Sequence, residues 1–245
     1  MAAVMNGLAL YSGLIPYGGT FLIFSDYCKP SIRLSALMGL RVVYIFSHDS
    51  IGLGEDGPTH QPIEQLTGLR AIPNLNVFRP ADINEKLECW EIALKSKNTP
   101  SAIALSRQKL PYINPNFSEN NKCENGAYIV KITSHDSNVT LVASGSEVEI
   151  ALNVQETLKE NGIESKVVSM PCQELFEKQS DDFKNDILET NSLIVTIEAG
   201  NVSSWNKFLG NKGISLGINK FGESAPYKEV YDHFNLSVEK IVSTI

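Results

Sequence analysis

Apolar residues fall into short continuous runs along the chain, and amphipathic segments separate these runs. Residues 41–46 (RVVYIF), 139–144 (VTLVAS) and 192–198 (SLIVTIE) are rich in β-branched or aromatic side chains, which is typical of strands buried on both faces. Residues 101–106 (SAIALS) form another short apolar run, which we also predict to be a strand. Because strands that alternate with helices form parallel sheets, the pattern predicts an α/β fold. We expect two doubly wound units whose sheets are mainly parallel.

The segments between these runs carry helix signals. Residues 1–13 are apolar on most faces, so we expect a buried helix there, and a second helix over 31–40 with Ile32, Leu34 and Leu37 facing inward. Asp82, followed three residues later by Glu85, is a capping-box-like start for a helix over 82–96. Further strands and helices are predicted at 76–80, 145–163, 165–170, 181–189, 210–218, 225–234 and 237–245.

Residues 108–126 have little apolar periodicity and contain two prolines and five asparagines, which indicates a linker. We therefore expect two domains, at 1–117 and 118–245. The charge differs between them: residues 1–117 carry 10 basic and 9 acidic side chains, whereas residues 118–245 carry 11 and 19. An acidic second domain argues against binding to nucleic acid.

Composition places the protein among soluble cytoplasmic proteins. No apolar run approaches the ~18 residues that a membrane span needs, and the amino-terminal segment lacks the basic start of a signal peptide. The four cysteines are far apart and form no CxxC pair, so neither a zinc site nor a disulfide framework is expected.

The segment HDSIGLGEDGPTH, residues 48–60, follows a predicted buried strand and holds two of the four histidines. Ligands of parallel α/β sheets bind beyond the carboxyl ends of strands, so position alone makes this loop a candidate site. Imidazoles and a carboxylate together can hold a polyol and move protons. Metal binding by His48, Asp56 and His60 is disfavoured, because their spacing matches no metal motif.

Three other features have two interpretations each on the residues alone. Phe21, Phe24 and Tyr27 recur every three residues, which fits either a core stripe or a pocket for a planar ring. Arg107 at a strand end fits either a surface residue or a phosphate ligand. Ser146 fits a helix cap better than an anion site. We assign the other arginines of the first domain to surface or interface pairs: Arg33, Arg41, Arg70 and Arg79.

The long stretch SHDSIGLGEDGPTHQPIEQLTGLRAIPNLNVFRPAD resembles the signature region of the transketolase family. FLIFSDY, LSALMG, SAIALSRQ and GINKFGESAPYKEV match the same family in order, so the resemblance covers nearly the whole chain. It implies a thiamine-diphosphate-binding pyrimidine domain followed by a transketolase C-terminal domain. Deoxyxylulose-phosphate synthase shares only the GEDGPTH core and is the alternative family.

The resemblance also implies a function and residue roles. Transketolases move a two-carbon ketol unit from a ketose phosphate to an aldose phosphate, using thiamine diphosphate with Mg²⁺ or Ca²⁺. The matching aromatic residues, Phe21, Phe24 and Tyr27, would hold the aminopyrimidine ring. His48 and Arg107 would bind the substrate phosphate and Asp56 a substrate hydroxyl. His60 would be both substrate-binding and catalytic, close to the reacting carbon.

In that family the catalytic glutamate, the diphosphate-binding domain and the metal ligands lie upstream of the point that matches Met1. We therefore expect no metal ligands in this chain, and no transketolase activity from this polypeptide alone. Expected partners are the missing amino-terminal domain, a second copy in a homodimer, and sugar phosphates of the pentose phosphate pathway. A non-catalytic α/β dimerisation subunit is the alternative from a different class, although a scaffold has no need for His48, Asp56, His60 and Arg107 together.

Overall fold

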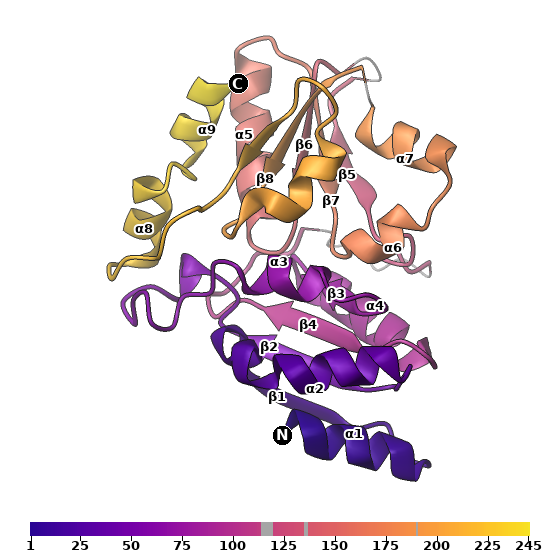
Figure 1. Cartoon of the computed structure of the whole chain (residues 1–245). Helices are drawn as coiled ribbons and strands as arrows, with labels where there is room; N and C mark the ends of the chain where they lie inside the picture. The colour runs from indigo at the N-terminus through magenta and orange to yellow at the C-terminus, as the bar shows by residue number, and fades with distance from the viewer. Residues whose placement is uncertain (114–119, 135–136, 190) are drawn as a thin grey trace.

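The computed structural model describes residues 1–113, 120–134, 137–189 and 191–245. Two α/β units are stacked, with helices α1–α4 around the lower sheet and α5–α9 around the upper sheet (Figure 1). The boundary expected at 117/118 falls outside the described residues, as does His135, which we assigned to the surface or to structure. His233 is exposed, as that assignment expects, and its ring contacts Phe234 edge-on.

The first sheet is wholly parallel and has the strand order β1-β2-β4-β3. Its strands are β1 (Tyr17–Phe21), β2 (Val43–Ser47), β3 (Asn76–Phe78) and β4 (Ser101–Leu105). Strand β1 was not predicted, because the glycines of Tyr-Gly-Gly-Thr-Phe resemble a turn. The central strands β2 and β4 match the apolar runs that predicted them.

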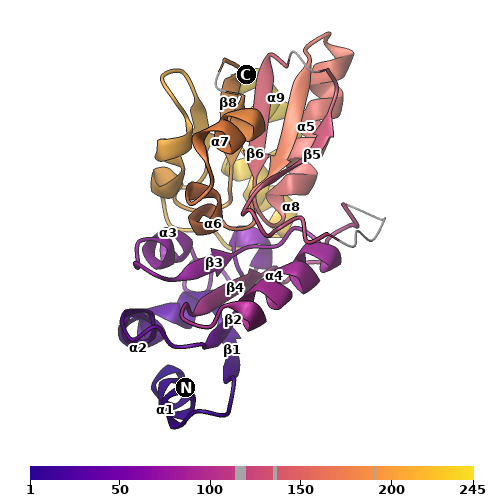
Figure 2. The same ribbon diagram turned by 90° about the vertical axis from the view of Figure 1, so that its right-hand side faces the viewer.

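Helices α1 (Ala2–Tyr11), α2 (Ser25–Leu37) and α3 (Gln65–Arg70) lie on one face of this sheet, and α4 (Ile83–Lys95) lies on the other (Figure 2). The prediction that the first helix is buried is wrong: Ala2, Met5 and Asn6 are buried, but Val4 is 66% exposed, because only one side of α1 packs on α2 and β1. Ile32 of α2 is buried as expected, whereas Leu34 and Leu37 are exposed.

The second sheet has the order β5-β7-β6-β8-β9. Strand β5 (Tyr128–Ile132) is antiparallel to β7, and the remaining pairs are parallel. The mainly parallel α/β fold predicted from the sequence is thus confirmed. The other strands are β6 (Val139–Ala143), β7 (Ser165–Ser169), β8 (Leu193–Ile197) and β9 (Ile214–Leu216).

Five helices surround this sheet. They are α5 (Glu147–Glu160), α6 (Gln173–Glu177), α7 (Asp181–Leu188), α8 (Tyr227–His233) and α9 (Val238–Thr244). Helices α5, α8 and α9 lie together on one face, and α6 and α7 lie on the other (Figure 1). Among the described residues, no helix combines the length and apolar character that a membrane span requires.

Three buried thiols meet where the two units join. Cys89 of α4 packs in one apolar cluster with Cys123 and Cys172 of the second unit, and each is at most 1% exposed. Burial raises the pKa of the Cys89 thiol above its ordinary value. Cys28 on α2 is half-buried. All four cysteines are free, as the sequence predicted.

Candidate active site

The candidate site lies at the carboxyl edge of the first sheet. Phe21, Ser47 and Leu105 occupy one row of neighbouring parallel strands, so the chain leaves the sheet at the same level after each of them. His48 follows Ser47 directly, and Arg107 follows Leu105 by two residues. The register therefore explains how residues distant in sequence come to share one edge.

The three predicted aromatic residues and the two loop histidines form a contiguous group of rings. His48 stacks on Phe21 with ring centres 3.7 Å apart, and Phe21 lies nearly parallel to Phe24 at 5.9 Å. Tyr27 lies 6.1 Å from Phe24, and His60 meets Phe24 edge-on at 6.0 Å. The structure thus brings together five of the seven predicted site residues.

The exposure of these rings decides between the two interpretations of the aromatic stripe. Phe21 and Phe24 are half-buried, and Tyr27 is 86% exposed. None of them belongs to the buried core on that face of the sheet, so the core interpretation is wrong. An uncovered wall of aromatic rings fits a planar heterocycle, because flat rings gain contact area at low entropic cost.

His48 has an unusual backbone and a perturbed side chain. Its φ of 60° is left-handed, which is rare for a residue other than glycine and typical of functional loops. Its Nδ1 atom lies 3.0 Å from Ser47 Oγ. Burial, and then the charge of Arg107, lower the pKa of His48, while Asp56 opposes this shift. Arg107 and Asp56 therefore lie close enough to affect the His48 ring electrostatically.

Asp56, Arg107 and His60 are accessible to a ligand. Asp56 and Arg107 are exposed, and within the described ranges neither makes an ion pair shorter than 4 Å. His60 is half-buried, and its Nδ1 atom lies 2.9 Å from Thr59 Oγ1. Across the described part of the chain, no three His, Cys, Asp or Glu side chains gather as a metal site. The exposed acceptor and donors suit sugar hydroxyl and phosphate groups.

A buried ion network lies beneath the loop and joins the two units. Arg79, which is fully buried after β3, donates from Nε to Asp49 Oδ2 at 2.8 Å. Its Nη1 atom donates to Ser144 O at 2.9 Å and to the Glu147 carboxylate of α5. Tyr231 of α8 donates to the same carboxylate at 2.6 Å. The residue next to His48 is thus fixed to the second unit.

Arg70 makes a second buried pair across the units. It donates two hydrogen bonds to Glu198, of 2.7 and 2.8 Å, and Trp205 Nε1 donates a third of 2.9 Å. Burial alone would raise the pKa of Glu198, but the Arg70 and Arg79 charges lower it to about 2. We assigned Arg70 and Arg79 to surface or interface pairs from the sequence. In the structure both arginines form buried pairs between the two units.

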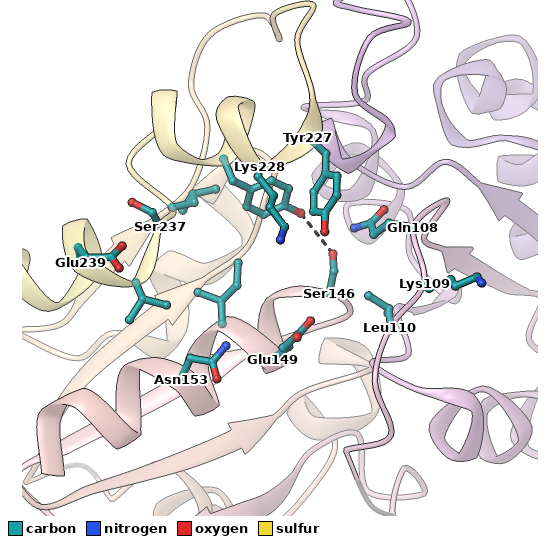
Figure 3. Close-up of a pocket in the computed structure, with 14 residues that line it drawn as sticks. Gln108, Lys109, Leu110, Ser146, Glu149, Asn153, Tyr227, Lys228, Ser237 and Glu239 are labelled. Carbon is teal, nitrogen blue, oxygen red and sulfur yellow. Dashed lines mark hydrogen bonds between the residues drawn. The ribbon is translucent and has the colours of Figure 1, made fainter. Parts of the chain in front are cut away.

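The prediction that the Ser146 side chain caps α5 is wrong. Ser146 occupies the cap position, but its hydroxyl makes no capping bond and instead donates to Glu147 Oε1 at 2.8 Å. Its Oγ also lies 3.3 Å from the Tyr231 hydroxyl, and both line a cavity of about 500 Å³ between the units (Figure 3). Gln108 lies at the edge of this cavity toward the loop (Figure 3).

Sequence reasoning missed the residues that support the site from below. Asp49 stood within the loop but carried no assigned role, and Arg79 is paired with Glu147, 68 residues further on. No local pattern reports such a distant partner. The available signal was that Arg79 directly follows the apolar pair Val77 and Phe78, in a place where a charge that becomes buried has to be paired.

Comparison with known proteins agrees with this geometry. Residues 1–112 match the family described as "Transketolase, pyrimidine binding domain", and residues 126–237 match "Transketolase-like TK C-terminal domain". A transketolase of Sinorhizobium medicae is 52% identical over 244 residues, which is 99% of this chain and 35% of the relative. A transketolase of Aquifex aeolicus is 46% identical over 247 residues, which covers 36% of that relative. The chain thus spans about a third of the length of the relatives it matches.

Solved structures give the same result. Transketolase from Campylobacter jejuni superposes with a TM-score of 0.92 at 45% identity, over 100% of this chain and 37% of that one. Transketolase from Pichia stipitis in complex with sedoheptulose 7-phosphate superposes with a TM-score of 0.93 at 39% identity, over 100% of this chain and 35% of that one. A structure titled as a split-gene transketolase, an inactive β4 tetramer, shares the fold at a TM-score of 0.82 and 23% identity, over 98% of this chain and 78% of that one.

Proposed function

This chain belongs to the transketolase family, and we propose that it forms the sugar-phosphate and aminopyrimidine side of a thiamine-diphosphate-dependent ketol transfer site. The observation that carries the proposal is the contiguous ring group. Phe21, Phe24 and Tyr27 form a partly exposed aromatic wall, and His48 and His60 both contact it. A ring held on that wall would lie beside both imidazoles.

The residues of this chain then take distinct roles. Phe21, Phe24 and Tyr27 would hold the aminopyrimidine ring, and bound thiamine diphosphate supplies the nucleophilic carbon that carries the two-carbon unit. His48 and Arg107 would donate charge-assisted hydrogen bonds to the substrate phosphate. Asp56 would accept a hydrogen bond from a substrate hydroxyl. His60 would donate to the oxygen on which negative charge develops.

His48 suits a phosphate site because its pKa is lowered before any ligand binds. Burial and Arg107 both disfavour the imidazolium, so they favour the neutral ring in the free protein. A bound phosphate dianion opposes both effects and favours protonation. Binding therefore couples to the uptake of a proton, and the ring becomes a stronger donor once the ligand has arrived.

The wider setting is also a proposal. We infer that the whole enzyme acts in the cytoplasm within the pentose phosphate pathway and uses Mg²⁺ or Ca²⁺, with metal ligands outside this chain. We also infer a homodimer, which is supported by the apolar side chains exposed on and after α1: Val4 is 66%, Leu10 59% and Tyr17 70% exposed. Binding to nucleic acid or membranes is not expected.

The test restores the part of the enzyme that relatives possess. A fusion would place this chain in the position of the matching third of the Sinorhizobium medicae transketolase, and ketol transfer from a ketose phosphate to an aldose phosphate would be assayed with thiamine diphosphate and Mg²⁺. We expect transfer from the fusion and none from the same fusion lacking the cofactor. A folded, cofactor-saturated fusion without transfer would refute the proposed function.

A further inference from the structure

The glycine-rich loop 48–60 is in contact with one short segment of the second unit, residues 222–227 (GESAPY), which we call the clamp segment. This segment precedes α8 and lies against the loop that follows β2 (Figure 1). Ser224 Oγ donates to Glu55 O, and Gln61 Nε2 donates to both Gly54 O at 2.8 Å and Glu223 O at 2.9 Å. The clamp segment therefore contacts the loop on both sides of Asp56.

The glycines in both segments make this contact possible. Gly54 and Gly57 have φ of +84° and +76°, and a Cβ on Gly57 would lie 3.2 Å from Ser224 Cβ. A Cβ on Gly222 would lie 1.7 Å from Gln61 Oε1 and 2.8 Å from its Cδ. Two of the three loop glycines, Gly54 and Gly57, thus have a specific cause, which is the close approach of the clamp segment.

Hydrogen bonds within the loop and from Ser224 fix the conformation of the turn that carries Asp56. Gly57 N donates to Gly54 O at 3.2 Å, so residues 54–57 form a β-turn with Asp56 at its third position. Turns of types I and II differ by a flip of their central peptide, which changes φ at the third position, where Asp56 lies. Glu55 O belongs to that central peptide, so the Ser224 hydroxyl holds it in one orientation.

The same bonds extend to His60. Gly57 O accepts from His60 N and from Gln61 N, both at 3.1 Å, and Gln61 is only 2% exposed. Gln61 Oε1 has no hydrogen-bond partner. The two bonds that Nε2 donates, to Gly54 O and Glu223 O, are therefore what fixes the buried side-chain amide of Gln61. Asp56 and His60 are consequently ordered by one bonded unit rather than by two independent loops.

We propose that the clamp segment determines which hydroxyl stereochemistry the site accepts, with Ser224 and Gln61 as positioning residues for Asp56. This inference rests on the proposed function. Neither residue needs to touch the substrate, because Ser224 binds the peptide that precedes Asp56 and Gln61 binds the carbonyl of Gly54 at the start of the same turn. The second unit thereby contributes to specificity although it supplies none of the predicted substrate ligands.

The experiment uses the fusion described above and the two enantiomers of glyceraldehyde as acceptors. These acceptors carry no phosphate, so their discrimination does not involve His48 or Arg107. We expect Ser224→Ala and Gly222→Ala to reduce the ratio of kcat/KM for the two enantiomers by about three- to tenfold, the range that one hydrogen bond provides. Ser224→Thr, which keeps the hydroxyl, retains the ratio, and so does Ser243→Ala on the exposed face of α9.

A second measurement needs no catalysis. Hydrogen exchange in this chain should become faster at the amides of Gly57 and His60 in Ser224→Ala and Gly222→Ala, while the amides of β2 and β4 keep their protection. This readout separates a local change in the loop from a general loss of stability. It also applies to Gly222→Ala if that variant is too inactive for kinetics.

The outcomes distinguish the two proposals. A wild-type fusion without transfer refutes the proposed function, and hydrogen exchange then still tests the clamp. An active wild type whose variants keep the enantiomer ratio refutes the clamp inference, and so does an equal loss of kcat/KM for both enantiomers. Unchanged exchange at Gly57 and His60 refutes it as well.

Discussion

The left-handed backbone at His48 and the stacking of its ring on Phe21 leave this side chain little freedom. That rigidity fits a ligand residue, because a pre-ordered donor loses less entropy when the substrate binds. Sequence analysis identified His48 from its place after a strand and its resemblance to a family motif. Its left-handed φ had no counterpart in the sequence, since glycine is the residue expected there.

Arg107 is predicted to act on binding rather than on the chemical step. In the fusion enzyme, Arg107→Ala should raise KM for a phosphorylated sugar about 10- to 100-fold with little change in kcat, because a charged hydrogen bond contributes roughly 1.5–3 kcal/mol. Steady-state kinetics with phosphorylated and unphosphorylated acceptors would check this. An equal effect on both acceptors would show that Arg107 does not recognise phosphate.

His60 is predicted to act mainly on the chemical step. His60→Ala should lower kcat by about 10²–10³, the usual effect of removing one donor to a developing negative charge. His233→Ala, at an exposed position on α8, is the matched control and should leave kcat unchanged. A His60→Ala variant with normal kcat and raised KM would instead make His60 a simple binding residue.

At the scale of elements, apolar periodicity located the central strands and the edge strands β3 and β9, but it missed the edge strands β1 and β5. Strands β2, β6 and β8 are rich in β-branched or aromatic residues and β4 is a short, mostly apolar run, because both faces of each strand are covered. Strand β5 exposes alternate residues, and β1 contains two glycines, so neither resembles a central strand. The start of α4 was predictable, because Asp82 Oδ1 accepts from Glu85 N at 2.8 Å within a single turn.

The Glu85 side chain joins α4 to the second sheet. Its carboxylate accepts from Ala81 N at 2.6 Å, from Ser169 Oγ at 2.6 Å and from the Tyr128 hydroxyl at 2.8 Å. Burial raises the pKa of Glu85 from 4.5 to about 7, against the opposing effect of these bonds. Between pH 4.5 and about 7, Glu85 is protonated in the folded protein and ionised in the unfolded chain. The contribution of this proton to the free energy of unfolding is therefore full below pH 4.5 and is lost as the pH rises through 7.

Glu85→Gln should therefore remove part of the pH dependence of stability. Glutamine resembles the protonated acid, so between pH 5 and 8 the free energy of unfolding should fall more for the wild type than for the variant, by up to ~3 kcal/mol. Urea unfolding followed by circular dichroism would measure both slopes. Glu239→Gln on α9 is the control, and a Glu85→Gln slope equal to the wild-type slope would contradict the assigned pKa.

At the scale of the whole molecule, the two units share a buried ion network rather than a flexible connection. Arg79→Met would leave the Asp49 and Glu147 carboxylates buried without their cation, at a cost of about 3–5 kcal/mol. We expect one unfolding transition in the wild type and a lower urea midpoint in the variant. Two separate wild-type transitions would show that the network does not couple the units.

The same network contains the contacts that could not be predicted from the sequence. Two α/β units and a candidate ligand loop after a buried strand could be predicted, because each depends on local pattern. The pairing of Arg79 with Glu147 and of Arg70 with Glu198 depends on how the units pack, and a lone arginine after a strand is compatible with many partners. The candidate site residues could be proposed one by one from the sequence, whereas the contacts that the second unit makes beneath them could not.

The buried thiols at the junction can report the separation of the two units through their chemical reactivity. A thiol-reactive dye can reach half-buried Cys28 in the native state, but it can reach Cys89, Cys123 and Cys172 only after the units part. Cys28 should therefore be labelled promptly and the other three thiols with a delay. The rate of the delayed labelling would measure how fast the units separate, with no added probe. If the three buried thiols react at the same rate, the junction between the units opens in a single cooperative step.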